Sequence, residues 1–322
     1  MTKRTKLEEL DLSLGKRTRL HRLLYEHGPG NGTLLLLPID QGLEHGPVDF
    51  FPNPPSADPD YQCRLAAEGN YSGIVFHVGL ATKYLKEYAG TVPLVLKLNG
   101  KTNIPSDAEA FSAQESTGED AVRLGADAVG YTLYVGSPAQ GRDFVQLGQV
   151  RAECERYGMP LIVWSYPRGS AINAKGGRNS IYAVDYAARV ANELGADVVK
   201  LNVPKFRDPG NADSPAPYRQ LYDEWKALDE DDAYRQAVEK VVASAGRTMV
   251  LFSGGSRIGD EDLLQKARIC VASGATGLIF GRNMWQRPFE EGLEITHAVQ
   301  EILKTDLAVL RRQVRGGGPA PR

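Results

Sequence analysis

Cysteine is scarce in this chain. Three cysteines occur among 322 residues, at positions 63, 154 and 270. No two of them form a CxxC pair, and an odd number cannot all be paired in disulfides. Each stands in a helix-like or core-like context, which predicts buried, reduced thiols.

An excess of charge and long apolar runs are also lacking. The 38 basic and 40 acidic residues leave a formal net charge of −2, so charge gives no reason to expect a nucleic acid or a membrane surface as partner. The N-terminus is charged and has no apolar signal-peptide core, and no run approaches the length that spans a bilayer. With 42% hydrophobic residues, the composition predicts a soluble globular protein of the cytoplasm.

The chain does contain a repeated unit, in which a short apolar run is followed by a glycine-rich or polar loop and a helix-length segment. Each run is bounded by Gly, Pro, Asp or Asn, as expected of a buried strand. The runs span residues 34–39, 73–78, 94–98, 128–135, 161–165, 198–203, 249–253 and 277–280. Alternating strands and helices imply a parallel sheet, and eight units over about 250 residues predict an α/β fold of the (β/α)8 TIM-barrel type. A doubly wound sheet is the alternative, but no GxGxxG follows the first run.

The barrel is expected to occupy residues 33–315, between two short flanking segments. Residues 1–32 are charged and helix-capable, with leucines at 7, 10, 14 and 20 suggesting one apolar stripe. This extension is expected to close the barrel bottom or to pack on another subunit. One last helix is predicted at about 290–314, and residues 316–322 are expected to be disordered.

Two insertions fall after predicted strands, on the face where barrels build their active sites. Residues 50–59 are rich in proline and predict a rigid loop. Residues 205–232 are polar, with several prolines and acids. Both are interpreted as lids or subunit contacts.

One lysine stands in the middle of an apolar strand. Lys200 shares a face of the predicted strand with Val198 and Asn202. Both faces of a parallel strand are normally covered, so this lysine loses its water or neutralises, and either outcome lowers its pKa. A neutral amine is what carbonyl chemistry through a Schiff base requires. The alternative is a structural lysine that pairs with a carboxylate across the barrel.

A second lysine and an aromatic pair bear on the choice of nucleophile. Lys97 shares a face with Asn99 in the same way, so it competes with Lys200, and two inward lysines lower each other's pKa. Trp164 and Tyr166 share a face of the preceding strand, which lies roughly 5 Å from that of Lys200. A tyrosine there is a competent general acid or base, although an aromatic pair also fills barrel cores. The proximity of Tyr166 favours Lys200 as the nucleophile.

Acidic and glycine-rich strand ends complete the candidate site. Asp40 ends the first strand, where a carboxylate positions a substrate hydroxyl or relays protons. Glu44 and His45 follow it and either cap the loop or, with Asp40, begin a metal site that needs further ligands. After the last two strands, the glycines and donors of residues 253–255 and 281–282 predict a phosphate site, unless they are simple turns. The donors and glycines concerned are Ser253, Gly254, Gly255, Gly281 and Arg282.

Together, these motifs resemble one family along residues 34–284. In order they are Asp40-Gln-Gly-Leu-Glu-His-Gly-Pro, Lys97-Leu-Asn-Gly-Lys, Trp164-Ser-Tyr-Pro-Arg-Gly, the strand lysine Lys200, Ser253-Gly-Gly and Gly281-Arg282. The set is similar to that of the archaeal-type class I fructose-bisphosphate aldolases. The resemblance implies a metal-free, cofactor-free lyase of glycolysis or gluconeogenesis that reversibly cleaves fructose 1,6-bisphosphate to dihydroxyacetone phosphate and glyceraldehyde 3-phosphate.

The resemblance also implies roles for residues. Lys200 would form the Schiff base, Tyr166 would transfer protons, and Asp40 and Trp164 would orient the substrate. The loops at 253–255 and 281–282 would hold the phosphate of the dihydroxyacetone phosphate half, and homo-oligomers, often decamers, are typical. Further substrate contacts are assigned to Lys97, His45 and Arg168, with Arg168 and Lys205 as candidates for the second phosphate.

Other functions fit the same motifs. Sister enzymes catalyse an aldolase-type step toward an aminosugar precursor of aromatic amino acids, or act as thiolases on a phosphorylated dione. A non-catalytic sugar-phosphate-binding barrel would keep the phosphate loops but form no trapped adduct, and a flavin-binding barrel would leave Lys200 unexplained. The longer segment after residues 198–203 departs from the family pattern, which leaves the aldehyde partner open.

Overall fold

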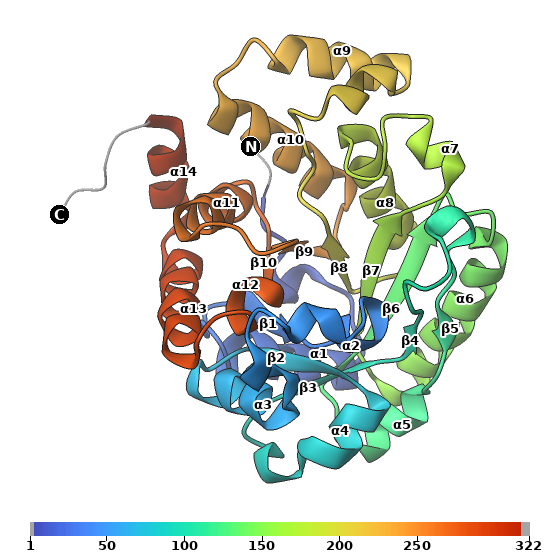
Figure 1. Cartoon of the computed structure of the whole chain (residues 1–322), viewed down its shortest axis with the longest axis vertical. Coiled ribbons are helices and arrows are strands. Elements are labelled where there is room, and N and C mark those ends of the chain that lie inside the picture. The colour runs from blue at the N-terminus through green and yellow to red at the C-terminus, as the bar shows by residue number, and fades with distance from the viewer. Residues whose placement is uncertain (1–2, 317–322) are drawn as a thin grey trace.

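The computed structural model describes residues 3–316, and eight parallel strands close into a barrel at its centre (Figure 1). The strands are β1 (Leu34–Pro38), β2 (Gly73–His77), β3 (Leu94–Lys97), β6 (Ala128–Val135), β7 (Leu161–Pro167), β8 (Val198–Leu201), β9 (Met249–Ser253) and β10 (Gly277–Ile279). They pair in the closed order β1-β10-β9-β8-β7-β6-β3-β2. The predicted TIM barrel is confirmed, and each predicted strand overlaps an observed one.

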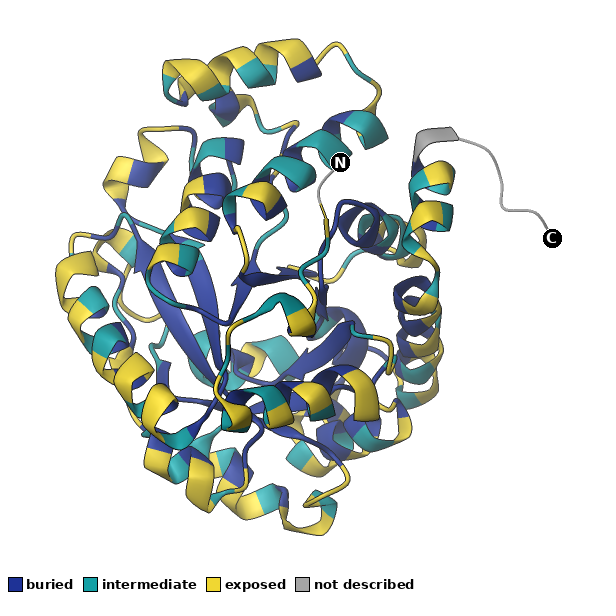
Figure 2. Ribbon diagram, turned by 180° about the vertical axis from the view of Figure 1, so that it is seen from behind, coloured by how far each residue is buried: buried dark blue, intermediate teal, exposed yellow. Residues whose placement is uncertain are grey.

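Helices surround the barrel, and Figure 2 shows the buried strands inside a shell whose outer faces are exposed. The helices of the shell and the loops are α2 (Gln41–Glu44), α3 (Pro59–Glu68), α4 (Val78–Tyr84), α5 (Gly118–Arg123), α6 (Gln140–Tyr157), α7 (Ser170–Asn173), α8 (Ile181–Glu193), α10 (Glu230–Ser244), α11 (Asp260–Ala272), α12 (Arg282–Trp285) and α13 (Phe289–Lys304). None of the helices in the described range is long and apolar enough to cross a membrane.

Strand alternation divides the apolar residues into two cores. In β1, Leu34 and Leu36 point into the barrel and join Val198 of β8 in an inner cluster. Their neighbours Leu35 and Leu37 belong to the outer cluster between strands and helices. Because both faces are covered, the strands read as continuous apolar runs, which is why the sequence located them. The three cysteines are buried and free, as predicted.

The N-terminal extension closes the bottom of the barrel. It contains a 3-10 turn (Leu7–Glu9), helix α1 (Leu14–His21) and a π turn (Arg22–Glu26). Leu20, Leu23 and Leu24 are fully buried in the inner cluster. The predicted single stripe of leucines is wrong, because Leu14 is 84% exposed. The segment is not one helix: α1 starts only at Leu14, where Ser13 caps its N-terminus.

Ion pairs fasten this extension to the N-terminal ends of the strands. Lys16 is buried and lies 2.9 Å from Asp197, the residue before β8. Arg22 lies 2.7 Å from Asp127, the residue before β6. The barrel bottom is therefore closed by both apolar packing and charge pairing.

The insertion at 205–232 carries structure of its own. It contains a 3-10 turn (Pro209–Asp213) and helix α9 (Ala216–Trp225), which lies outside the ring next to α10 (Figure 1). Phe206 is fully buried in a small separate core with Trp225 and Ala233. This core anchors the segment that follows β8. Three polar residues of that segment, Lys205, Arg207 and Asp208, line the cavity at the barrel mouth.

The proline-rich insertion forms two short 3-10 turns (Pro47–Phe50 and Pro54–Ala57). Asn53 between them donates to the backbone oxygens of Trp285 and Arg287. The loop is thus fixed to the segment that follows β10, in keeping with the predicted rigidity.

The last predicted helix is two helices. α13 ends at Lys304, and α14 (Leu307–Gly316) begins after Asp306, whose carboxylate accepts from the backbone N–H of Ala308 at 2.8 Å. Such an N-cap starts a new helix and breaks the old one. Of the tail predicted to be disordered, residues 317–322 lie outside the described residues.

Candidate active site

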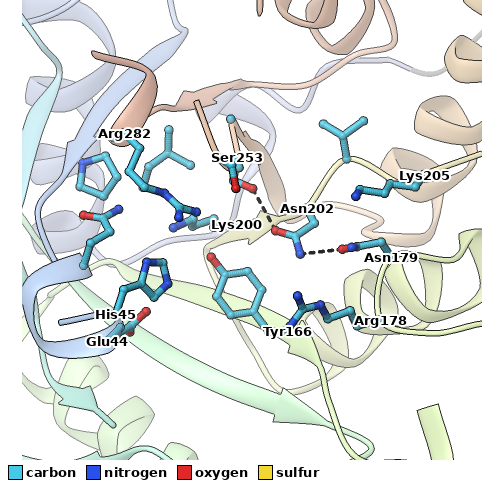
Figure 3. Close-up of a pocket in the computed structure, with 18 of the residues that line it drawn as sticks. Glu44, His45, Tyr166, Arg178, Asn179, Lys200, Asn202, Lys205, Ser253 and Arg282 are labelled. Atoms are coloured by element: carbon cyan, nitrogen blue, oxygen red, sulfur yellow. Dashed lines mark hydrogen bonds between the residues drawn. The ribbon is translucent and has the colours of Figure 1, made fainter. Parts of the chain in front are cut away.

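A cavity of about 930 Å³ opens at the C-terminal ends of the strands. Its walls come from β1, β6, β7, β8, β9 and β10, from the loops that follow them, and from Lys101, Asn103 and Asp107. Among the lining residues are Asp40, Tyr166, Lys200, Ser253, Gly281 and Arg282. In the view of Figure 3, Lys200 and Tyr166 lie between Arg282 on one side and Arg178 and Lys205 on the other. Cationic groups thus flank an amine and a phenol.

The two inward lysines have different partners. The Nζ of Lys97 lies 2.9 Å from the carboxylate of Glu44 and 3.6 Å from that of Asp40. The Nζ of Lys200 lies 5.0 Å from the ring centroid of Trp164 and 5.6 Å from that of Tyr166. The Trp164 ring is shared, because the Nζ of Lys97 lies 5.3 Å from its centroid. Both lysines are buried, but of the two only Lys200 lines the cavity.

These environments shift the two pKa values in opposite directions. Burial lowers the pKa of Lys200, and this effect outweighs the opposing charges of Asp40 and Glu44. Burial also tends to lower the pKa of Lys97, but the charges of Glu44 and Asp40 outweigh this effect and raise it. The pKa of Asp40 is held below its usual range because Lys200 and Lys97 outweigh its burial. The geometry therefore makes Lys97 a structural ammonium and Lys200 the more readily neutralised amine.

Trp164 forms the floor under the amine. It is fully buried and pairs in register with Lys200, so its indole lies beneath the cavity. The neighbouring inward position on β6 is Gly130, where a Cβ would come within 2.7 Å of the indole. Glycine there lets the indole lie across the barrel. Trp164 and Lys97 are both fully buried and lie behind the residues that line the cavity.

Tyr166 stands one layer higher, at the mouth of β7. The strand extends past the predicted end because Tyr166 pairs in register with Tyr134 of β6. Burial, reinforced by Glu44 and Asp40, raises the pKa of the phenol. Tyr166 therefore keeps its proton at neutral pH and is ready to donate it.

The loops after β9 and β10, for which the sequence predicts a phosphate site, border the cavity. Ser253, Gly254, Gly255, Gly281 and Arg282 all line the cavity. A Cβ at Gly254 would lie 2.7 Å from the side-chain nitrogen of Asn283, so only glycine lets this loop pass so close. Arg282 lines the cavity beside these glycines, and glycine-rich loops with an arginine are typical of phosphate sites.

Asn202 joins this loop to the opposite side of the cavity. Its side-chain oxygen accepts from the hydroxyl of Ser253 at 3.0 Å, and its side-chain nitrogen donates to Asn179 at 3.1 Å (Figure 3). The backbone oxygen of Asn179 in turn accepts from the N–H of Lys205 at 2.7 Å. The sequence placed Asn202 on the face of Lys200 but assigned it no role.

The sequence of the chain matches a known protein family over most of its length. The sequence model of the family described as DeoC/LacD family aldolase matches residues 34–287, from β1 to just beyond α12. The chain belongs to this family. The predicted family resemblance is thereby confirmed at the level of the aldolases.

Individual relatives within this family agree with the assignment. The "Fructose-bisphosphate aldolase class 1" of Thermoproteus tenax is 38% identical over 84% of this chain and 90% of its own length. The "Fructose-bisphosphate aldolase/6-deoxy-5-ketofructose 1-phosphate synthase" of Methanocaldococcus jannaschii is 31% identical over 84% of this chain and 81% of its own. An archaeal fructose-1,6-bisphosphate aldolase, solved with its catalytic lysine bound to a carbinolamine intermediate, superposes with a TM-score of 0.73 at 36% identity, over 89% of this chain and all of that one.

One residue of this aldolase-family site escaped the sequence analysis. The carboxylate of Asp49, in the turn after α2, lies 2.7 Å from the Nδ1 of His45 and 3.7 Å from the guanidinium of Arg282. It therefore orients two of the predicted substrate contacts. Its only sequence signal was a lone acid in a proline-rich stretch.

The acidic cluster after β1 is occupied by cations. Asp40 and Glu44 face Lys97, and His45 turns to Asp49. Within residues 3–316, no group of three or more His, Cys, Asp or Glu side chains is arranged to hold a metal ion.

Arg168, predicted to bind substrate, lines the cavity and lies 3.1 Å from Asp107.

Proposed function

We propose that this chain is a class I fructose-bisphosphate aldolase, which cleaves fructose 1,6-bisphosphate reversibly through a Schiff base on Lys200. The observation that carries this proposal is the buried amine of Lys200, with its lowered pKa, in a cavity that has cationic groups at both ends. A ketose with a phosphate at each end matches that distribution of charge. The names of the relatives agree with it.

In the first half of the reaction, the Nζ of Lys200 attacks the C2 carbonyl of the sugar. The carbinolamine loses water and becomes an iminium, which withdraws electrons from the C3–C4 bond. The C4 hydroxyl gives its proton to a base, and the carboxyl groups of Asp40 and Glu44 line the cavity as candidates for it. The C3–C4 bond breaks, glyceraldehyde 3-phosphate leaves, and the bonding electrons form an enamine on Lys200.

In the second half, the enamine needs a proton at C3. Tyr166 holds one, because its pKa is raised, and its ring centroid lies 5.6 Å from the Nζ of Lys200. Proton transfer from the phenol restores the iminium. Water then adds to C2 and releases dihydroxyacetone phosphate together with the free amine.

Two anion sites fix the sugar along the cavity. The loops at 253–255 and 281–282, the second of which carries Arg282, bind the C1 phosphate. His45 lies beside this phosphate. The C6 phosphate lies at the other end, near Arg168 and Lys205. Asp40 and Trp164 orient the hydroxyls and the iminium between them.

We infer also that the enzyme works in glycolysis or gluconeogenesis in the cytoplasm, as a homo-oligomer built from the barrel of residues 33–315. Exposed apolar side chains support the oligomer: Phe51 in the proline-rich loop is 70% exposed and Leu14 is 84% exposed. Light scattering of the purified chain measures the subunit number.

The test of the proposed function is reductive trapping. Mixing the protein with dihydroxyacetone phosphate and sodium borohydride should add one reduced triose phosphate per chain, on the peptide that contains Lys200, with or without EDTA. Intact mass and peptide mapping measure this. Cleavage of fructose 1,6-bisphosphate that EDTA abolishes, without an adduct, would refute the Schiff-base mechanism.

The name of the relative from Methanocaldococcus jannaschii supports a second candidate, a sister reaction on a phosphorylated ketose of the same length. Both reactions would leave the same adduct on Lys200. Substrate profiling separates them, because only the proposed function requires a high kcat/KM for fructose 1,6-bisphosphate.

The pH dependence of trapping should reflect the environment of Lys200. Attack needs the neutral amine, and burial lowers the pKa of Lys200 from its ordinary 10.5. As the pH falls, the trapping rate should therefore decline through a midpoint below 10.5, the ordinary pKa of a lysine. Asp40 raises the pKa of Lys200, so in Asp40→Asn the fall should move to lower pH. A fall centred near 10.5 in the wild type would contradict the assignment.

A further inference from the structure

A flap leaves the barrel between β3 and α5. Its base is a two-stranded antiparallel ribbon, in which β4 (Asn99–Gly100) pairs with β5 (Ala113–Gln114). The intervening residues 101–112 include the 3-10 turn Asp107–Glu109. Lys101 and Asp107 of this flap line the cavity. The flap therefore borders the end of the cavity that lies away from the phosphate loops.

Asp107 lies among three cations. Its carboxylate is 3.0 Å from the Nζ of Lys101, 3.1 Å from the Nε of Arg168 and 3.8 Å from the guanidinium of Arg178. These groups outweigh the burial of Asp107 and lower the pKa of its carboxyl. Arg168 comes from the end of β7 and Arg178 from the loop before α8. Three chain segments thus converge on one carboxylate.

The same cations face the space in which a substrate would lie. Lys101, Arg168 and Arg178 all line the cavity, and Arg168 is only 16% exposed. A cluster of guanidinium and ammonium groups is the usual binding site of a phosphate. Here a carboxylate of the chain itself occupies it. Asp107 is 42% exposed, so it loses little hydration in the pair and regains water easily when it leaves.

We propose that Asp107 limits the preference for a second phosphate at the distal end of the cavity, because its carboxylate occupies the position that this phosphate of the substrate takes. This inference rests on the proposed function. A phosphate dianion carries twice the charge of a carboxylate and displaces Asp107 from the cations. A hydroxyl at the same carbon cannot, so a ketose without the second phosphate leaves the cations paired with Asp107.

The consequence is a selectivity that one substitution changes. Asp107→Asn keeps the shape of the side chain and removes the competing charge. The bisphosphate then meets free cations, while fructose 1-phosphate has no group to place there. We expect the ratio of KM for fructose 1-phosphate to KM for fructose 1,6-bisphosphate to rise about tenfold, which corresponds to about 1.4 kcal/mol.

The matched control is Glu109→Gln, the same change of charge two residues along the same turn, at an exposed position. It should leave the KM ratio at the wild-type value. This separates a local effect from a general rise in positive charge, which would favour both substrates because both carry the C1 phosphate.

Four outcomes overturn the inference. An equal change in the ratio for both variants would mean a general charge effect. A higher KM for the bisphosphate in Asp107→Asn would make the carboxylate a support that holds the cations in place. A wild-type chain that does not cleave fructose 1,6-bisphosphate would refute the proposed function and this inference with it, whereas cleavage with an unchanged ratio refutes this inference alone.

Discussion

Lys200→Met should lower kcat by about 10⁴-fold or more, because no other route to the iminium remains. The reduced adduct with dihydroxyacetone phosphate should disappear as well. The substitution should cost little stability, since burial already disfavours charge at this position and methionine fills a similar volume. Steady-state kinetics, intact mass after borohydride and a thermal unfolding curve measure the three effects.

Lys97→Met is the matched control, a change of the same kind in a neighbouring layer of the same barrel. The substitution leaves the carboxylates of Glu44 and Asp40 without their close cation. The free energy of unfolding should therefore fall by about 3–5 kcal/mol. The adduct on Lys200 should persist in the folded fraction. An adduct on the Lys97 peptide in the wild type, or full activity in Lys200→Met, would assign the nucleophile to Lys97 instead.

The fold was predictable because its signals are local. Glycine ends three helices just before strands, at Gly125, Gly195 and Gly274, and each of these has a positive φ. An apolar run between two such signals is buried on both faces only as a strand of a parallel sheet that helices cover. The two errors also have local causes: Ser13 starts a helix that leaves Leu14 outside, and Asp306 starts a second helix where a continuous one was expected.

The assignment of the two lysines was only partly predictable. Strand alternation placed both in the barrel, and the sequence context of Lys97 and Asn99 is nearly that of Lys200 and Asn202. The difference lies in Glu44, which reaches Lys97 from a loop after a different strand. Loop conformations depend on contacts across the whole face, as those of Asp49 and Asp107 also show. The alternation of side chains along a strand, with its period of two residues, carries no information about loop conformations.

Equal burial with unequal partners explains how one barrel holds a permanent cation and a reactive amine side by side. Lys200 and Lys97 together hold the pKa of Asp40 below its usual range. Ionised Asp40 opposes the neutralisation of Lys200 but does not prevent it, because Glu44 bonds to Lys97 and not to Lys200. Moving one carboxylate by a few ångströms would exchange the roles of the lysines. The site therefore depends on the short helix α2, which carries Glu44.

Tyr166→Phe should separate the two halves of the reaction. The phenol is the proposed donor to C3 of the enamine, and its raised pKa keeps it protonated at neutral pH. Without it, kcat should fall by about 10²–10³-fold, whereas Lys200 should still be trapped with dihydroxyacetone phosphate. Exchange of the C3 proton of dihydroxyacetone phosphate with deuterated water, followed by NMR, should be lost together with turnover.

Tyr134→Phe provides the control for this experiment, because Tyr134 is the in-register neighbour of Tyr166, lines the same cavity and carries the same phenol. Its loss removes the same atom from the same cavity, so any effect of altered packing or hydration should appear in both variants. Proton exchange should survive in Tyr134→Phe. If Tyr166→Phe kept the exchange and lost only the adduct, the phenol would serve the formation of the iminium, and the proton at C3 would have to come from Asp40, Glu44 or water.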